Sequence, residues 1–182
     1  MIIYLLNIFL ILFWGFLLIY NKSSSKKRLF FCVISSLQWT LISGLRAAEI
    51  GADTSGYIRQ FENAEGYSWQ VIIDAFKEVY FTNGATLSVG TNPLHKDPGY
   101  VVFEKIMHFF TDNAQVYLFI VAVLIFSSLA YFIYKNSEDP VFSYILFSTL
   151  FYSFYAITGI RQALATALIV FVGFEKKKKR KL

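Results

Sequence analysis

Long apolar runs separated by short polar segments dominate the pattern along this chain. The first run, Ile2–Tyr20, is interrupted only by Asn7, and further runs cover residues 29–45 and 115–134. A helix rises about 1.5 Å per residue, so about 20 apolar residues cross the roughly 30 Å hydrocarbon core of a bilayer. Each run therefore predicts a transmembrane helix. For Asn7, a hydrogen bond to a neighbouring helix and a tolerated polar position near the interface both stay open.

The apolar stretch from residue 141 to residue 174 is too long for one span and carries Gly159 and Arg161 near its middle. An arginine at the centre of a bilayer costs about 2.5–3.5 kcal/mol on insertion scales. We therefore expect the chain to break there, with a rather short span after the break. The pattern predicts an all-α, polytopic membrane protein with about five transmembrane helices, at residues 2–20, 29–45, 115–134, 141–157 and 162–174.

Charged residues are segregated along the chain. A basic cluster between Lys22 and Arg28 follows the first run, and residues 176–181 form a second basic run. Because positive segments stay on the cytoplasmic side, we expect the N-terminus outside and the C-terminus in the cytoplasm. Residues 46–114 carry five basic and nine acidic residues, a balance of minus four. This segment is interpreted as one extracytoplasmic loop.

The extracytoplasmic loop is patterned as helices. Ser68 is placed to cap one helix, and Asp97-Pro98 has the capping residue and first-turn proline of another. After Ser68, apolar residues at helical spacing form one face, namely Trp69, Ile72, Ile73, Phe76 and Tyr80. We expect such faces to lie flat in the membrane interface or to dip into it as a lid.

Composition agrees with an integral membrane protein and excludes several chemistries. The 182 residues are 56% hydrophobic and only 16% charged. The single cysteine, Cys32, allows neither an internal disulfide nor a cysteine metal site. His95 and His108 are 13 residues apart, without the regular spacing of metal ligands. Phosphate-binding glycine loops and nucleophile elbows are also missing from the sequence. We expect no metal, no cofactor and no nucleic-acid partner.

Two arginines carry the candidate chemistry. The predicted topology places Arg46 and Arg161 on the same outer side, each at the end of a span. An arginine there offers a fixed charge and a planar fork of donors that suits phosphate and diphosphate oxygens. The alternative is that both side chains only anchor helices at the lipid headgroups.

Carboxylates and a histidine in the extracytoplasmic loop offer acid-base chemistry. Asp53 and Glu49 follow Arg46, and Asp97 opens the last helix of the loop. A carboxylate beside a sugar hydroxyl acts as a general base. Equally, Asp53 and Asp97 fit as helix caps, the more favoured role for Asp97. His95 is an acid-base candidate in the loop, whereas His108, on an apolar helix, is expected to pack or to lie in the interface.

Three blocks in the chain resemble one family. Arg46 is followed by Gly51-Ala52-Asp53-Thr54 with Tyr57 and Phe61, then by Asp97-Pro98-Gly99-Tyr100, and finally by Gly159-Ile160-Arg161-Gln162-Ala163-Leu164-Ala165. In this order they are similar to the EpsG family of bacterial exopolysaccharide and capsule clusters, which is similar to the Wzy-type polysaccharide polymerases. The resemblance covers the N-terminal half of longer family members.

The resemblance implies a reaction at the outer face of the bacterial plasma membrane. Repeat units carried on polyprenyl diphosphate would be joined by glycosyl transfer, possible partners being the bilayer and other polysaccharide-assembly proteins. Arg46 and Arg161 would stabilise the leaving diphosphate, and Asp53 would activate the acceptor hydroxyl. Around these three catalytic candidates we place the substrate-binding candidates Glu49, Tyr57, Arg59, His95, Asp97, Tyr100 and Gln162.

Two other classes of function stay open. A transporter or flippase subunit for the same lipid-linked glycan would need charged residues along a path through the spans, and these spans are nearly free of charge. A non-catalytic scaffold is favoured by the short chain and by Gly159, Ala163 and Ala167. These small residues recur at four-residue spacing and allow another helix to approach closely.

Overall fold

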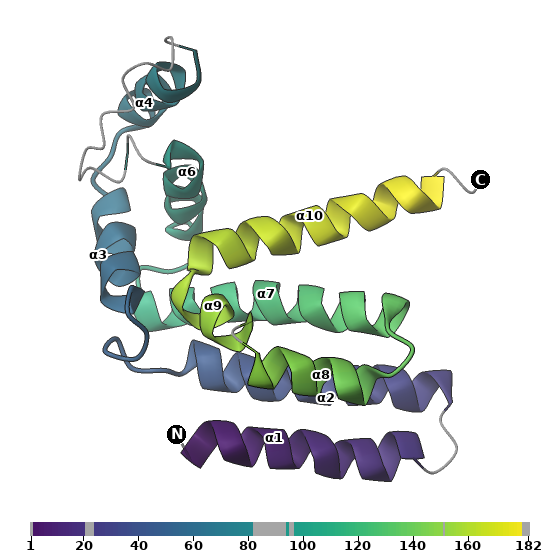
Figure 1. Cartoon of the computed structure of the whole chain (residues 1–182). Coiled ribbons are helices and arrows are strands. Elements are labelled where there is room, and N and C mark those ends of the chain that lie inside the picture. Colours follow the sequence, from purple (N-terminus) through teal and green to yellow (C-terminus); the bar gives the residue numbers. More distant parts are fainter. Residues whose placement is uncertain (1, 21–23, 82–93, 95–96, 151, 180–182) are drawn as a thin grey trace. The chain divides into compact units, whose positions relative to one another are not determined.

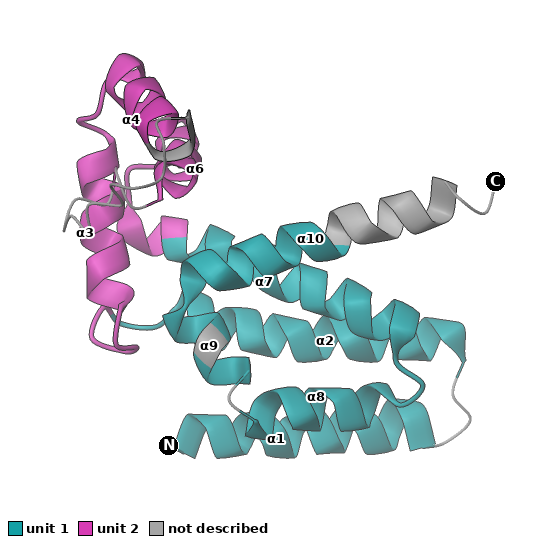
Figure 2. Cartoon of the chain, turned by 45° about the horizontal axis from the view of Figure 1, so that its top comes forward, with its two compact units in different colours: residues 1–47, 118–182 teal, residues 48–117 magenta. Residues whose placement is uncertain are grey.

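Every regular element in the part of the chain that the structure describes is a helix. The computed structural model describes residues 2–20, 24–81, 94, 97–150 and 152–179. The chain divides into two compact units (Figures 1 and 2). Unit 1 comprises residues 1–47 and 118–182, and unit 2 comprises residues 48–117. The expected all-α fold class is confirmed.

Unit 1 is built from the apolar runs. Its helices are α1 (Ile2–Gly15), continued by a π-helical turn η1 (Phe16–Tyr20), then α2 (Ser25–Gly44), most of α7 (Ala114–Asn136), α8 (Pro140–Thr149), α9 (Tyr152–Thr158) and α10 (Ile160–Lys179). Capping side chains mark the first residues of two of these helices. The Ser24 hydroxyl accepts from the backbone N–H of Lys27, and the Asp139 carboxylate accepts from those of Val141 and Phe142.

The core of unit 1 centres on Trp39 in α2, which is 1% exposed. Its ring lies 6.1 Å from that of Phe126 in α7 and 5.5 Å from that of Phe147 in α8, measured between centroids. On another side it meets Tyr4 of α1 at 6.1 Å. One aromatic side chain therefore contacts three neighbouring helices, which accounts for the way α1, α2, α7 and α8 lie side by side in Figure 1.

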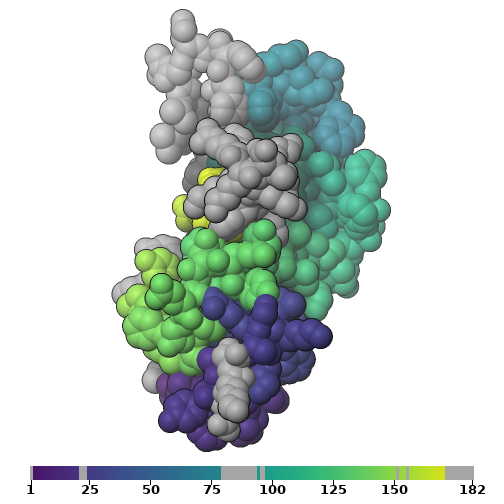
Figure 3. All heavy atoms as spheres, turned by 90° about the vertical axis from the view of Figure 1, so that its right-hand side faces the viewer, coloured from purple at the N-terminus to yellow at the C-terminus, as the bar shows by residue number. Residues whose placement is uncertain are grey.

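Buried polar side chains also connect the helices of unit 1. The Tyr144 hydroxyl in α8 lies 2.6 Å from the Ser36 hydroxyl and donates to the Cys32 carbonyl at 2.9 Å, both in α2. In an exposed contact, the hydroxyls of Ser25 and Tyr134 lie 3.0 Å apart and join the start of α2 to the end of α7. Figure 3 shows the molecule from the side on which α2 begins, with that part of the chain in dark blue. Such bonds between membrane helices contribute about 0.6 kcal/mol each on average.

The span count is less simple than the pattern predicts. Ile2–Tyr20 and Ala114–Asn136 are long and apolar enough to cross a membrane. A third candidate is the pair α8 and α9, which are bent by 72° relative to each other. The helix α2 opens with three basic residues and does not qualify, and Ile160–Val170 is apolar but short. The five spans therefore stay a prediction.

Three features that the sequence singled out in the spans can be compared directly with unit 1. Gly159 lies outside the helices, between the end of α9 and the start of α10, so the expected break beside Arg161 is present. Asn7 is buried at 2% exposure, and its amide has no hydrogen-bond partner among the described residues. At Ala167, one of the small residues of α10, the backbone carbonyl accepts from the Ser128 hydroxyl of α7 at 3.1 Å.

In the described part of unit 2, three amphipathic helices surround a small core. They are α3 (Thr54–Ala64), α4 (Trp69–Phe81) and α6 (Pro98–Met107). Ser68 caps α4 as predicted, since its hydroxyl accepts from the backbone N–H of Val71 at 3.3 Å. The buried cluster contains one or two side chains from each helix, namely Ala64, Ile72, Ala75 and Val101, together with Leu94.

Replacing Gly44 with alanine tests the contact between α2 and α7. A Cβ at this position would lie 2.7 Å from Cδ2 and 3.0 Å from Cα of Phe119, and the backbone atom cannot rotate away. We expect Gly44→Ala to lower the free energy of unfolding by about 1–3 kcal/mol, as overpacking does. Denaturant titration of the purified protein in micelles measures this loss.

The matched control is Gly56→Ala in α3, where a Cβ meets no heavy atom within 4 Å. This change is expected to be neutral or to stabilise by up to about 1 kcal/mol, because alanine favours a helix over glycine. Equal stabilities of the two variants would contradict the close approach of α2 and α7.

Candidate functional site

The Arg46 side chain lies just beyond the C-terminal end of α2 and is 5% exposed. One terminal nitrogen, Nη1, donates to the Ser43 carbonyl at 2.6 Å and to the Ser43 hydroxyl at 2.8 Å. The other, Nη2, donates to the Ile157 carbonyl of α9 at 3.0 Å. Carbonyls in the last turn of a helix lack intrahelical partners. Arg46 therefore supplies donors to two helix ends at once.

Arg161 follows this contact closely in the chain. It lies four positions after Ile157 in the chain, so the two Cα atoms are at most about 14 Å apart. Its side chain is half-buried in the first turn of α10, where the backbone N–H of Ala163 donates to the Gly159 carbonyl at 3.0 Å. The structure thus brings Arg46 against the segment that leads into Arg161. Figure 1 shows the junction between α9 and α10 and the C-terminal end of α2 at the same end of unit 1.

Two polar residues adjoin the arginines. Thr158 lies between the carbonyl that Arg46 binds and Gly159; it is 7% exposed, and its hydroxyl has no hydrogen-bond partner among the described residues. Gln162, a predicted substrate-binding residue, is exposed in the first turn of α10. The junction between α9 and α10 therefore combines two guanidinium groups, a buried hydroxyl and an exposed amide.

The other predicted residues belong to unit 2, except that His95 lies outside the described residues. Glu49, Asp53 and Arg59 are exposed, while Asp97 is half-buried. Both aspartates stand at the N-cap positions of α3 and α6, but neither side chain makes a cap hydrogen bond. Side-chain capping by Asp53 and Asp97 is therefore wrong. The Asp97 backbone carbonyl begins α6 instead, by accepting from the N–H groups of Tyr100 and Val101.

Two tyrosines of unit 2 meet a buried carboxyl group that the sequence did not single out. The hydroxyls of Tyr100 and Tyr117 lie 2.5 Å apart, and the Tyr117 hydroxyl donates to Oε1 of Glu104 at 3.5 Å. Glu104 is 0% exposed, and the ring of Tyr57 packs edge-on against that of Tyr100. The positions of Tyr100 and Glu104, one helical turn apart in α6, were the one local sign of this network.

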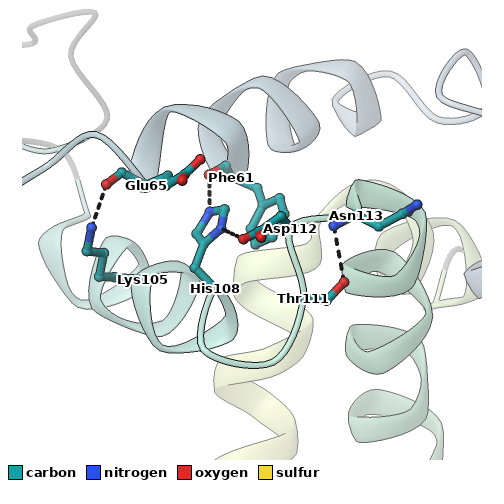
Figure 4. A network of polar contacts seen from close by, with 7 residues as sticks. All are labelled: Phe61, Glu65, Lys105, His108, Thr111, Asp112 and Asn113. Carbon is teal, nitrogen blue, oxygen red and sulfur yellow. Dashed lines mark hydrogen bonds and ion pairs between the residues drawn. The ribbon is translucent and has the colours of Figure 1, made fainter.

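A stack of aromatic rings holds the C-terminal end of α6 against α3. The Phe61 ring lies between the His108 ring at 4.1 Å and the Tyr117 ring at 4.2 Å, both nearly parallel to it. Nε2 of His108 lies 2.8 Å from the Phe61 carbonyl, and Nδ1 lies 3.0 Å from Asp112 (Figure 4). Figure 4 also shows Lys105 donating to the Glu65 carbonyl. The expected packing role of His108 is confirmed.

In the described part of the chain, no group of three or more histidine, cysteine, aspartate or glutamate side chains is placed to hold a metal ion. The buried Glu104 accepts from the Tyr117 hydroxyl, and His108 lies within hydrogen-bond distance of the Phe61 carbonyl and the Asp112 carboxylate. The site's charge is supplied by guanidinium groups.

These features define a helical membrane protein with an apolar helical bundle, a separate unit of amphipathic helices and a buried arginine that bonds two helix ends. The sequence comparison gives the family: residues 29–182 match the EpsG family, and the chain belongs to it. Neither a curated protein nor a solved structure gives a significant match. The chain is therefore a membrane protein related to exopolysaccharide biosynthesis.

Replacing Arg46 with lysine tests its hold on the segment before α10. A lysine keeps the charge but lacks the fork of donors that bonds Ser43 and Ile157 together. We expect backbone amides of residues 158–163 to exchange hydrogen for deuterium faster in Arg46→Lys. Mass spectrometry of the protein in lipid nanodiscs measures this exchange.

Arg59→Lys is the matched control, because Arg59 is exposed on α3. Exchange in residues 158–163 should not change in that variant. If Arg46→Lys also leaves the exchange unchanged, the bond to the Ile157 carbonyl does not hold this segment.

Proposed function

We propose that this chain takes part in joining exopolysaccharide repeat units that are carried on a polyprenyl diphosphate, at the outer face of the membrane. The observation that carries the proposal is the hydrogen bond from Arg46 to the Ile157 carbonyl. It links an arginine at the end of α2 to the segment that leads into Arg161. Family membership supplies the broader context of exopolysaccharide biosynthesis.

The proposed reaction is a glycosyl transfer. A hydroxyl oxygen of the acceptor sugar attacks the anomeric carbon of the donor, and the bond from that carbon to the diphosphate oxygen breaks. The acceptor hydroxyl loses its proton to a base, and polyprenyl diphosphate leaves with the bonding electron pair. Negative charge grows on the leaving diphosphate, so fixed positive groups beside it lower the barrier.

The two arginines have different roles in this proposal. Arg46 is buried and bonded to carbonyls, which suits a residue that positions the junction between α9 and α10. Arg161 is only half-buried, so its guanidinium is the one proposed to contact the diphosphate. The buried Thr158 hydroxyl beside it is a further donor for a phosphate oxygen.

Unit 2 is proposed to handle the acceptor sugar. Asp53 offers an exposed carboxylate that can take the proton of the acceptor hydroxyl. Tyr57 and Tyr100 present aromatic rings in the same unit, and the bonds from Tyr100 through Tyr117 to Glu104 hold one of these rings in place. Glu49, Arg59 and Asp97 remain proposed substrate-binding residues.

The test replaces Arg161 in cells whose exopolysaccharide depends on this chain. In Arg161→Ala, we expect polymer formation to fall by about 10²–10³-fold, the usual loss when one preorganised charge-stabilising group is removed. Single lipid-linked repeat units should accumulate at the outer face. Arg161→Lys should retain part of the activity, since it keeps the charge without the planar fork. Polymer length and lipid-linked intermediates are measured by gel electrophoresis and mass spectrometry.

Lys135→Ala serves as the control, because it removes a positive charge from the last turn of α7. It should leave the polymer normal. Normal polymer in Arg161→Ala would refute the proposed role of this arginine. A glycan trapped on the inner face would instead indicate a transporter of the same lipid-linked glycan.

A further inference from the structure

Basic side chains gather where two helices of unit 1 meet. The helix α7 carries Lys135 in its last turn. The first turn of α2 holds no acidic residue but three consecutive basic ones, namely Lys26, Lys27 and Arg28. The hydroxyls of Ser25 and Tyr134 lie 3.0 Å apart and join these two helix ends. Positive charges that are more than a hundred residues apart in the sequence are therefore neighbours in the fold.

This end of unit 1 is also where both candidate spans finish. Ile2–Tyr20 and Ala114–Asn136 are long and apolar enough to cross a membrane. Figure 1 shows their last turns at the same end of unit 1 as the start of α2. Tyr20 ends the first of these spans and Tyr134 lies in the last turn of the second. Tyrosines are enriched where lipid meets water, so we expect these basic side chains at the level of the lipid headgroups.

Arg28 lies on the side of α2 that meets α7. Residues three apart in a helix share a face, so Arg28 lies above Ser25, whose hydroxyl contacts Tyr134. Its side chain is half-buried, and its Nε has no hydrogen-bond partner among the described residues. Lys26, two positions earlier, is exposed and lies about 200° away around the helix. The α7 side of α2 thus presents an arginine donor that the described protein atoms leave unused.

Lys135 adds a second charge on the α7 side. It is exposed, and its Nζ lies 5.3 Å from the centroid of the Tyr134 ring. The acidic residues that follow are Glu138 and Asp139, and the Asp139 carboxylate caps α8. Together with the three basic residues of α2, four positive charges stand against two negative ones. The name α2–α7 junction is used below for four residues, namely Ser25, Arg28, Tyr134 and Lys135.

The chemistry of the α2–α7 junction suits a phosphate group. Basic residues at the N-terminal end of a helix oppose its dipole, so helix stability does not explain their presence in the first turn of α2. Retention of a basic segment on one side of the membrane requires no contact between α2 and α7 either. A phosphate beside them removes the electrostatic conflict and accepts from guanidinium, ammonium and hydroxyl donors. Basic clusters next to spans favour anionic lipids in this way.

We propose that the α2–α7 junction binds the headgroup of an anionic phospholipid, with Arg28 and Lys135 as the cationic partners of its phosphodiester. Leu29 and Phe30 follow in α2 at 47% and 54% exposure, and they offer apolar contact to the acyl chains. The inference concerns unit 1 alone. It depends neither on the proposed glycosyl transfer nor on which side of the membrane this end lies.

Spin-labelled lipids test the preference directly. The full chain is reconstituted in phosphatidylcholine vesicles that contain a trace of spin-labelled phosphatidylglycerol or, in a parallel sample, spin-labelled phosphatidylcholine. Electron paramagnetic resonance measures the fraction of each label whose motion the protein restricts. We expect phosphatidylglycerol to associate severalfold more strongly than phosphatidylcholine, and this preference to weaken as salt screens the charges. Equal association of the two lipids with the unaltered protein would overturn the proposal.

Arg28→Gln and Lys26→Gln form a matched pair, because each removes one positive charge from the first turn of α2. We expect Arg28→Gln to remove most of the preference for phosphatidylglycerol and Lys26→Gln to remove little of it. Arg28→Lys should retain part of the preference, since it keeps the charge without the planar fork. Circular dichroism in the same vesicles checks that each variant keeps its helices. If Arg28→Gln unfolds, Lys135→Gln gives the same comparison from α7.

Two further outcomes would contradict the assigned position. Equal losses in Arg28→Gln and Lys26→Gln would indicate diffuse attraction to the basic segment rather than a site between α2 and α7. A preference that disappears only when the basic residues of 176–181 are changed to glutamine would assign the lipid contact to the C-terminal run instead.

Discussion

The requirement that helix-end carbonyls find donors shapes the site of this protein. The C-terminal ends of α2 and α9 both present carbonyls without intrahelical partners, and lipid offers no hydrogen bonds in their place. Arg46 supplies donors to both ends, across 111 residues of sequence. The start of α10, with Arg161, follows directly from that contact. The Arg46 guanidinium thus has a structural role first: its hydrogen bonds position the segment that carries Arg161.

Different interactions hold the helices together in the two units. Unit 1 is held by the buried Trp39 and by single hydroxyl bonds between helices, such as that between Tyr144 and Ser36. Unit 2 places a buried carboxyl group, Glu104, beside the Tyr117 hydroxyl, with Phe61 stacked on the Tyr117 ring. A buried carboxyl group is costly unless it is hydrogen-bonded. We therefore interpret this network as fixing Tyr100 at the surface of its unit.

Local features of the fold could be read from the sequence, and long-range ones could not. Ser68 and Pro98 mark helix starts by rules that involve only a few neighbouring residues, and Gly159 beside Arg161 marks a break for the same reason. By contrast, the end of α8 at Thr149 could not be predicted, because no glycine or proline lies there. The hydrogen-bond partners of Arg46 and Tyr117 depend on how helices that are distant in the sequence pack together. Such packing cannot be read from a single sequence. Asp53 and Asp97 match the capping pattern, yet their side chains make no cap bond, because residue type alone does not fix a side-chain rotamer.

Arg46 and Arg161 are proposed to lie at the same face of the membrane. Single cysteines at Ala47, Gln162 and Glu138, in a Cys32→Ser background, test it most directly, because all three positions are exposed in unit 1. A membrane-impermeant maleimide is applied to sealed vesicles of known orientation. We expect Ala47→Cys and Gln162→Cys to be labelled from one side and Glu138→Cys only from the other. Labelling of Gln162→Cys from the same side as Glu138→Cys would contradict it.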